Sequence, residues 1–176
     1  MPIFTVEILR GFNESALRDI LIIEKACFPV EWHYPDADKY YTTILRDDRN
    51  IIILLKDGQK AVGYILSVPH NVVRAELFQY DFQMKTDNAR YYIESIGISP
   101  QYRRRGGGTM LINTLCDEAK KRGICKFSIH SRTSNRLNIL IKRLFKGMIT
   151  ETRHIQRWFF GGNEPYEYIE WTYNKQ

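Results

Sequence analysis

The residues of this chain with the clearest chemical meaning form a basic, glycine-rich segment, RRRGGGT, at positions 103–109. An apolar stretch that ends at Ile98 precedes it, and an amphipathic stretch that begins at Met110 follows it. This order predicts a strand, a turn and a helix start, where amide N–H groups without intrahelical partners and the positive end of the helix dipole attract an anion. Glycine has no Cβ atom, so the backbone can approach such a ligand closely. We therefore interpret the segment as a diphosphate-binding turn with three arginines beside it.

Two common phosphate-binding motifs do not fit this segment. The P-loop pattern needs a lysine where Gly108 stands before Thr109, and the dinucleotide-binding pattern needs a glycine at Leu111. The pattern Arg-x-x-Gly-x-Gly, formed by Arg103, Gly106 and Gly108, resembles instead the acetyl-CoA signature of the Gcn5-related N-acetyltransferases (GNAT).

This resemblance implies an enzyme that uses acetyl-CoA as its cosubstrate. In that family, backbone N–H groups of the strand before the turn stabilise the oxyanion that develops on the acetyl group. The residues that match the family's cofactor site are Ile96, Gly97, Ile98, Arg103, Arg104, Arg105, Gly106, Gly107, Gly108, Thr109 and Asn135. Asn135 has a second interpretation, because an asparagine that opens a helix is also a natural cap.

Length and composition favour one compact domain that spans residues 1–176. The apolar content of 44% is ordinary, no apolar run is long enough to cross a membrane, and the initial MPIF does not resemble a signal peptide. We therefore expect a cytoplasmic protein without a membrane partner. Cys27, Cys116 and Cys125 lack paired metal-ligand spacing, so we interpret them as reduced packing residues and expect no metal.

The net charge of +6 leaves nucleic acid open as a partner. The charge lies mainly in short clusters, such as residues 103–105 and Lys142-Arg143, and the phosphates of CoA account for these as well. Because the sequence has no zinc-finger or RNP-type aromatic motif, a nucleic-acid-binding module is the weaker hypothesis.

The chemical groups need a scaffold, and hydrophobic periodicity predicts an α+β order of elements. We expect strands at 5–9, 51–55, 61–68, 90–99, 126–130, 148–160 and 166–173, and helices at about 13–28, 36–45, 110–122 and 135–145. Residues 69–89 are predicted to be an irregular insert with an extended arm, because Phe78, Tyr80 and Phe82 alternate. The GNAT resemblance implies a mixed, largely antiparallel central sheet with splayed fourth and fifth strands and flanking helices.

Further matches are similar to the protein N-terminal acetyltransferases, above all to the auxiliary-subunit type that accepts an initiator methionine. They are Phe28-Pro29-Val30, Tyr92-Ile93, Tyr102-Arg103-Arg104, Ile129-His130 and Ser134-Asn135. In these enzymes a tyrosine on the fourth strand and a histidine at the end of the fifth take a proton from the substrate α-amine through ordered water, and the matching residues are Tyr92 and His130. A protonated amine cannot attack a thioester, and an imidazole can accept its proton near neutral pH. The alternative is a core tyrosine and a hydrogen-bonded histidine at a strand end.

Glu94 is a competing candidate for the catalytic base. Strand alternation places it on the same face as Tyr92 and two residues nearer the glycine-rich turn. Many GNAT enzymes use a glutamate from this strand as the base. The alternative is a solvated charge where the two central strands part.

One part of the family pattern is missing from this chain. GNAT enzymes commonly use a tyrosine, within a pattern like Tyr-x-x-x-Gly-Phe, to protonate the departing thiolate, whereas this chain has IKRLFKGM at positions 141–148. Lys142, another donor or water would then protonate the thiolate.

In the resembling enzymes, the loop after the first helix and the loop between the last two strands hold the acceptor. The matching substrate-binding residues are Phe28, Pro29, Val30, Trp32 and Trp158. The resemblance implies direct acetyl transfer to a primary amine, with a protein or peptide N-terminus as the leading acceptor, and it is compatible with association with the ribosome. The alternatives are a small amine, such as a polyamine or an antibiotic, and a noncatalytic CoA-binding or RNA-associated module.

Overall fold

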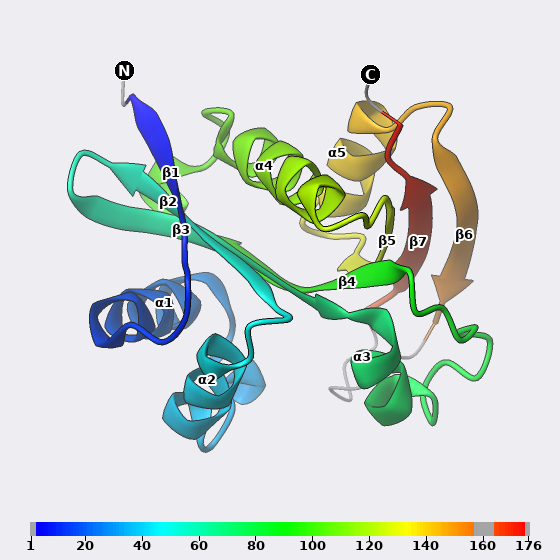
Figure 1. Ribbon diagram of the computed structural model, residues 1–176, viewed down its shortest axis with the longest axis horizontal. Coiled ribbons are helices and arrows are strands. Elements are labelled where there is room, and N and C mark those ends of the chain that lie inside the picture. The colour runs from blue at the N-terminus through cyan, green and yellow to red at the C-terminus, as the bar shows by residue number, and fades with distance from the viewer. Residues whose placement is uncertain (1–2, 157–163, 175–176) are drawn as a thin grey trace. The chain divides into compact units, whose positions relative to one another are not determined.

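The computed structural model describes residues 3–156 and 164–174, and every structural statement below concerns these ranges (Figure 1). Within them, seven strands form a mixed, mostly antiparallel sheet in the order β1-β2-β3-β4-β5-β7-β6. The strands are β1 (Phe4–Ile8), β2 (Ile51–Asp57), β3 (Lys60–Pro69), β4 (Arg90–Ile98), β5 (Lys126–Arg132), β6 (Ile149–Ile155) and β7 (Tyr166–Thr172). The helices are α1 (Glu14–Cys27), α2 (Ala37–Arg46), α3 (His70–Leu77), α4 (Gly107–Lys121) and α5 (Leu137–Leu144), with short 3-10 helices η1 (Val30–Trp32) and η2 (Pro100–Tyr102). The predicted α+β fold class is confirmed.

The chain divides into two compact units, which we describe separately. The first unit comprises Met1–Ser67 and Ser95–Glu118, and the second comprises Val68–Glu94 and Ala119–Gln176. The elements β3, β4 and α4 contribute residues to both units. The single domain expected over residues 1–176 stays a prediction. Among the described residues, no helix is both long and apolar enough to span a bilayer.

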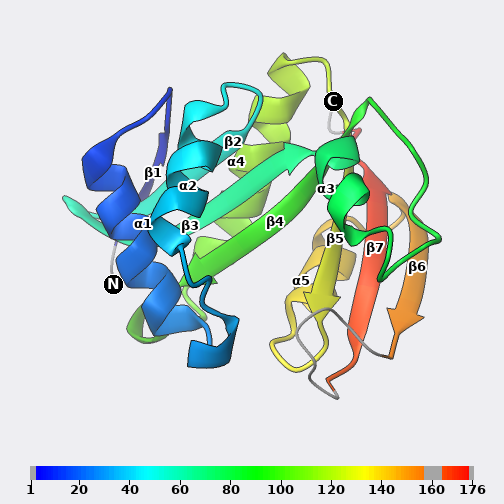
Figure 2. The ribbon, with the colours of Figure 1, turned by 90° about the horizontal axis from the view of Figure 1, so that it is seen from below.

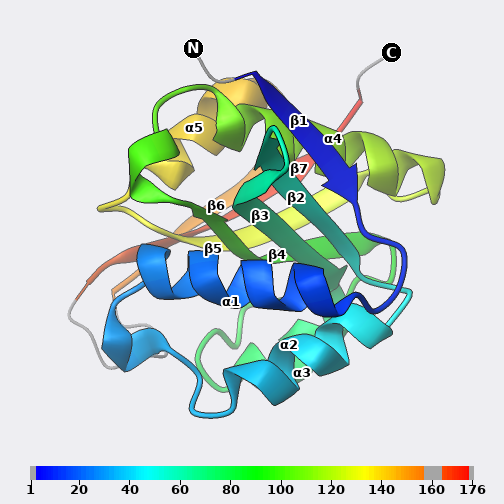
Figure 3. The same ribbon diagram turned by 90° about the vertical axis from the view of Figure 1, so that its left-hand side faces the viewer.

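Strand β2 lies at the centre of the first unit. Its residues Ile51 to Leu55 are all buried, and the strand runs antiparallel to both β1 and β3. Helices α1 and α2 lie against one face of these strands, and the beginning of α4 lies against the other (Figure 3). A strand that is covered on both faces has to be apolar at every position, which explains the uninterrupted sequence IIILL.

Helix α1 begins and ends where the sequence predicted. The Oδ1 atom of Asn13 accepts a hydrogen bond from the Ala16 amide at 2.9 Å, which caps the first turn. The buried residues Leu17, Ile20 and Ile23 then form the stripe that packs on the sheet. Helix α2 also lies in its expected place, and in the described structure its N-cap residue Asp36 makes no capping hydrogen bond with its side chain.

Strand β5 lies inside the second unit, where it pairs with β7 in an antiparallel ladder, and β6 follows at the edge (Figure 2). In the described ranges its parallel ladder with β4 covers three residue pairs, from Arg90 and Lys126 to Tyr92 and Ser128. Both strands continue beyond this ladder, which is the splay that the GNAT resemblance implied. Trp171 of β7 stacks between two phenylalanines and forms the core under α5. Its ring centroid lies 5.5 Å from that of Phe127 and 5.0 Å from that of Phe145.

The insert between β3 and β4 differs from the sequence prediction. It contains the helix α3, and the expected extended arm is wrong, because the amides of Phe78 and Tyr80 donate to the carbonyls of Arg74 and Leu77 in successive turns. The insert is tied to the second unit by buried His70, whose ring contacts Ser128 Oγ at 2.8 Å and the carbonyl of Lys85 at 3.0 Å. The periodicity of the sequence could not predict these contacts, because periodicity is local and the partners of His70 are distant in sequence.

Candidate active site

The glycine-rich turn of the first unit has the geometry that the sequence predicted. Helix α4 begins at Gly107, and its first internal hydrogen bond joins the Met110 amide to the Gly106 carbonyl at 3.1 Å. The amides of residues 107–109 therefore have no carbonyl partner within the helix. Gly106 has φ 87° and Arg104 has φ 61°, which are left-handed conformations that turn the chain into the helix. The turn thus presents amide N–H groups and the positive end of the α4 dipole beside exposed arginine side chains.

Two glycines of the predicted cofactor site serve packing in the first unit. A Cβ atom on Gly107 would lie 2.5 Å from Leu55 Cδ2, so glycine allows the start of α4 to rest on β2. A Cβ atom on Gly97 would lie 3.2 Å from the Tyr64 ring and 3.4 Å from Cys27 Sγ. The sequence suggested that Gly107 is a glycine so that a ligand can approach the backbone. The structure shows that it is also needed for packing against β2.

Arg103 joins the turn to the end of β4. Its Nε donates to the Ile98 carbonyl at 2.9 Å, while Arg104 and Arg105 are exposed. Burial raises the pKa of the Cys27 thiol, and hydrogen bonds from the Arg103 side chain and the Ile98 backbone partly oppose this. The Ile98 backbone is thus already engaged by two side chains, and its predicted role toward the acetyl group stays a prediction.

In the second unit, the two residues predicted to handle the proton are in contact. The Tyr92 hydroxyl and His130 Nδ1 are 3.0 Å apart, and both side chains are buried. The register explains the contact, because Tyr92 pairs with Ser128, and His130 follows two residues later on the same face of β5. The sequence placed these residues on adjacent strands, and the structure brings their polar atoms together.

Two further residues extend this contact, and the sequence analysis missed both. His130 Nε2 lies 3.0 Å from Asp81 Oδ2, and Arg153 Nη1 donates to Asp81 Oδ1 at 2.6 Å. Arg153 also donates to Glu151 at 2.5 Å, and its guanidinium lies 4.3 Å from the centroid of the Tyr168 ring. Asp81 lies in the insert and Arg153 on the edge strand β6, so no motif or local spacing links either residue to His130.

The protonation states within this chain of contacts follow from burial and charge. Burial lowers the pKa of His130 to about 4, although the carboxylate of Asp81 opposes this. Burial would raise the pKa of Asp81, but hydrogen bonds from His130 and Arg153 hold it well below its usual range. At neutral pH the carboxylate is ionised and can only accept, so His130 Nε2 carries the proton and donates to it. His130 Nδ1 is then an acceptor, and the Tyr92 hydroxyl donates to it.

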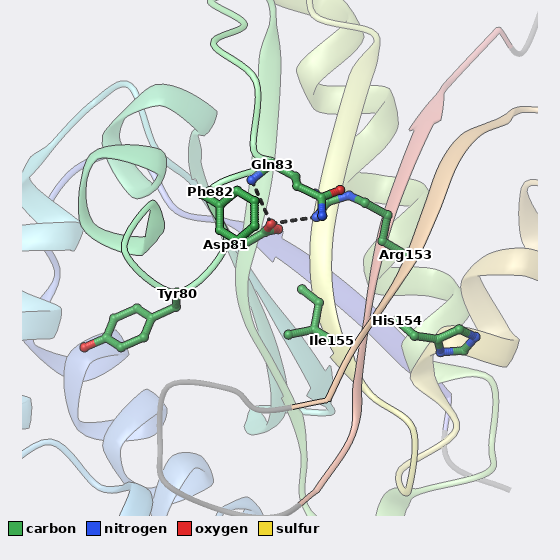
Figure 4. Close-up of a pocket in the computed structure, with 7 residues that line it drawn as sticks. All are labelled: Tyr80, Asp81, Phe82, Gln83, Arg153, His154 and Ile155. Carbon is green, nitrogen blue, oxygen red and sulfur yellow. Dashed lines mark hydrogen bonds and ion pairs between the residues drawn. The ribbon is translucent and has the colours of Figure 1, made fainter.

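A pocket of about 390 Å³ lies at the outer end of these contacts (Figure 4). Asp81 and Arg153 face each other in its wall, where the backbone amide of Gln83 also donates a hydrogen bond to Asp81 Oδ1 at 3.2 Å. The lining residues are Tyr80, Asp81, Phe82, Gln83, Arg153, His154 and Ile155. Within residues 3–156 and 164–174, no group of three or more His, Cys, Asp and Glu side chains is arranged to hold a metal ion.

Three other candidates lie as follows. Glu94 is half-buried on β4, and its role as a base stays a prediction. Asn135 Oδ1 accepts from the Leu137 amide at 3.0 Å, one residue before the N-cap position of α5, which Arg136 occupies, and its predicted contact with the cofactor stays a prediction. Lys142 forms an ion pair with Glu167, whose side chain is 3% exposed.

The predicted acceptor loop lies in the first unit. Phe28, Pro29 and Trp32 are half-buried, whereas Val30 is 78% exposed. His33 Nε2 donates to the Phe28 carbonyl at 3.0 Å and closes the short turn that contains η1. Trp158 lies outside the described residues.

Comparison with known proteins places this fold in a family. The sequence matches the model of the Acetyltransferase (GNAT) family over residues 17–140. A comparison with curated proteins finds no match.

Solved structures with the same fold include three acetyltransferases. The ribosomal-protein-S18-alanine N-acetyltransferase from Escherichia coli has a TM-score of 0.67 and 17% identity, over 99% of this chain and 96% of that chain. NAA60 from Arabidopsis thaliana, in complex with acetyl-CoA, has a TM-score of 0.68 and 18% identity, over 96% and 98%. Naa50 from Arabidopsis thaliana, in complex with the bisubstrate analogue CoA-Ac-MVNAL, has a TM-score of 0.66 and 21% identity, over 97% and 99%. At these identities the likeness shows the fold alone.

The family match covers more than half of the chain and includes the glycine-rich turn, β4 and β5. The turn at the start of α4 and the parting of β4 from β5 agree with that match. The chain therefore belongs to the GNAT family, whose members are N-acetyltransferases that use acetyl-CoA.

Proposed function

We propose that this acetyltransferase modifies the N-terminal α-amine of cytoplasmic proteins that begin with methionine. The observation that carries the proposal is the buried contact of 3.0 Å between the Tyr92 hydroxyl and His130 Nδ1. An α-amine has to lose a proton before it attacks a thioester, and a neutral imidazole that accepts from a hydroxyl can receive one. Naa50 of the same fold is bound to an analogue whose peptide, MVNAL, begins with methionine, which supports this choice of acceptor.

In the proposed reaction, the ammonium group of the acceptor gives a proton to the Tyr92 oxygen, directly or through water, while Tyr92 passes its own proton to His130 Nδ1. The amine nitrogen then bonds to the acetyl carbon, and the C–S bond of acetyl-CoA breaks. The nitrogen loses a second proton as the amide forms. One of the two protons goes to the CoA thiolate and the other to solvent, so charge and atoms balance.

The remaining parts of the site are assigned by their chemistry. The turn at residues 103–109 is proposed to bind the diphosphate of acetyl-CoA through helix N-terminal amides and arginine charge. Lys142 is paired with buried Glu167, so we assign protonation of the thiolate to water. A CoA thiolate is a good leaving group and needs little assistance.

The test is acetyl transfer from labelled acetyl-CoA to four acceptors at equal concentration. These are a peptide that begins Met-Val, the same peptide with an initial Ser, an N-terminally blocked peptide with an internal Lys, and spermidine, with mass spectrometry to locate the acetyl group. Burying the methionine side chain gains about 0.8 kcal/mol per methylene, so we expect roughly tenfold or greater preference for Met over Ser. Transfer to spermidine or lysine without α-acetylated peptide would overturn the proposed acceptor.

A pair of phenylalanine variants locates the acceptor pocket. Phe28→Ala should reduce the preference for Met over Ser, because Phe28 is half-buried in the loop after α1. Phe12→Ala is the matched control, since Phe12 is 42% exposed and stacks on Arg46, 5.1 Å from its ring centroid, elsewhere in the first unit. An equal loss of preference in both variants would contradict the assignment of this loop.

A further inference from the structure

We propose that Asp81 is a positioning residue, which the insert between β3 and β4 supplies to hold His130 in the tautomer that can accept a proton from Tyr92. This inference rests on the proposed roles of Tyr92 and His130 in amine deprotonation. It adds a third residue to that pair, one that orients His130 without taking the proton.

The geometry of the three groups supports this order. Both ring nitrogens of His130 are engaged, Nδ1 with the Tyr92 hydroxyl and Nε2 with Asp81 Oδ2, each at 3.0 Å. The His130 side chain is 1% exposed and that of Asp81 is 4% exposed, so water does not compete strongly for either group. When Tyr92 gives its proton to Nδ1, His130 becomes an imidazolium. Its Nε2–H group still donates a hydrogen bond to the Asp81 carboxylate, so the new positive charge is paired with a negative one.

Asp81 is itself held in one orientation. Arg153 Nη1 donates to Asp81 Oδ1 at 2.6 Å, and the Gln83 amide donates to the same oxygen at 3.2 Å. The other oxygen is therefore left for His130. Arg153 is fixed in turn by Glu151 and by the face of Tyr168, whose ring also lies 4.7 Å from the ring of His130.

The rest of the insert keeps the Asp81 loop in place. Arg74 Nε donates to the Met84 carbonyl at 2.7 Å, and His70 Nε2 contacts the Lys85 carbonyl at 3.0 Å. Met84, only 1% exposed, anchors the loop in the core of the second unit. Helix α3 and the loop after it therefore hold the Asp81 carboxylate in a fixed position and are not a solvent-exposed loop.

The hydrogen bonds that hold Asp81 predict a specific effect of the substitution Asp81→Asn. Because Arg153 and Gln83 donate to Oδ1, the carbonyl oxygen of the new asparagine will stay with them, and its NH₂ group will face His130. An NH₂ donor requires Nε2 to be an acceptor, which moves the His130 proton to Nδ1. The Tyr92 hydroxyl can then no longer pass its proton to His130, so catalysis should fall although the side-chain volume is unchanged.

The test combines tautomer and rate measurements on the full chain. Nitrogen-15 NMR of histidine-labelled protein reports which ring nitrogen carries the proton, and His130→Gln identifies its signals among the four histidines. We expect Nε2–H in the wild type, Nδ1–H in Asp81→Asn, and a fall in kcat of roughly 10²-fold or more with KM for acetyl-CoA unchanged.

Asp87→Asn is the matched control, because this carboxylate belongs to the same insert but contacts the Ala89 amide, Arg90 and Lys126. It should leave both the His130 tautomer and kcat as in the wild type. An Nδ1–H tautomer in the wild type, or a folded Asp81→Asn variant with unchanged kcat, would overturn the inference. The wild-type NMR measurement needs neither an acceptor nor the Asp81→Asn variant, and only its assignment uses His130→Gln. It therefore decides the placement of the His130 proton even if the proposed acceptor is wrong or Asp81→Asn does not fold.

Discussion

Removing the Tyr92 hydroxyl should slow acetyl transfer and destabilise the fold at the same time. Tyr92→Phe keeps the ring, which is 4% exposed, and deletes only the donor to His130 Nδ1. If the proton passes through this hydroxyl, kcat should fall by roughly 10²-fold, which corresponds to about 2.7 kcal/mol of activation free energy. His130 Nδ1 would also lose its partner in a buried position, so the free energy of unfolding should fall by about 1–3 kcal/mol.

The assay separates these two effects. Initial rates with a Met-Val peptide give kcat and KM, calorimetry gives the dissociation constant of acetyl-CoA, and urea denaturation gives the free energy of unfolding. Acetyl-CoA binding should stay as in the wild type, because Tyr92 is not among the residues assigned to the cofactor. Tyr91→Phe is the matched control, since Tyr91 is the preceding residue, points to the opposite face of β4 and is 7% exposed. A folded Tyr92→Phe enzyme with a wild-type kcat would refute the proton path.

Three other outcomes follow from the site. Glu94→Gln should keep kcat within about threefold of the wild type if Tyr92 and His130 are the base, and a loss confined to this variant in steady-state rates would make Glu94 the base instead. Gly108→Val should weaken acetyl-CoA binding by about 1–3 kcal/mol in calorimetry, because a branched side chain would cover amides in the first turn of α4, and wild-type affinity would remove the turn from the cofactor site. Burial lowers the pKa of His130 to about 4 from an unfolded value near 6.5, so the unfolded state binds more protons between these values. The free energy of unfolding should therefore fall by about 3 kcal/mol as pH falls from 6.5 to 4, and denaturation curves for His130→Gln should lack this component.

Local chemistry in the sequence was enough to predict the glycine-rich turn at the start of α4. Three consecutive glycines after three arginines, between an apolar stretch and an amphipathic one, define a turn at a helix start, and the structure begins α4 at Gly107. Hydrogen-bonding patterns and periodicity act within a few residues, which is why α1 begins directly after Asn13 as expected and β2 matches the run IIILL. The same reasoning failed for residues 70–77, because their helix α3 is held by distant contacts of His70 and Arg74.

Tertiary structure alone decided which further residues form hydrogen bonds with the pair Tyr92 and His130. Their strands could be predicted, and family resemblance pointed to the pair, but nothing local relates Asp81 to a histidine 49 positions later or to Arg153 on the edge strand. The partners of a buried imidazole are chosen by packing, because excluding water leaves each ring nitrogen dependent on whichever polar group the fold brings within about 3 Å. The sequence by itself thus determined the turn at the start of α4, and it predicts that a phosphate binds there and that Tyr92 and His130 carry the proton. The folded chain determined which polar groups contact the two nitrogens of His130, the Tyr92 hydroxyl at Nδ1 and the Asp81 carboxylate at Nε2.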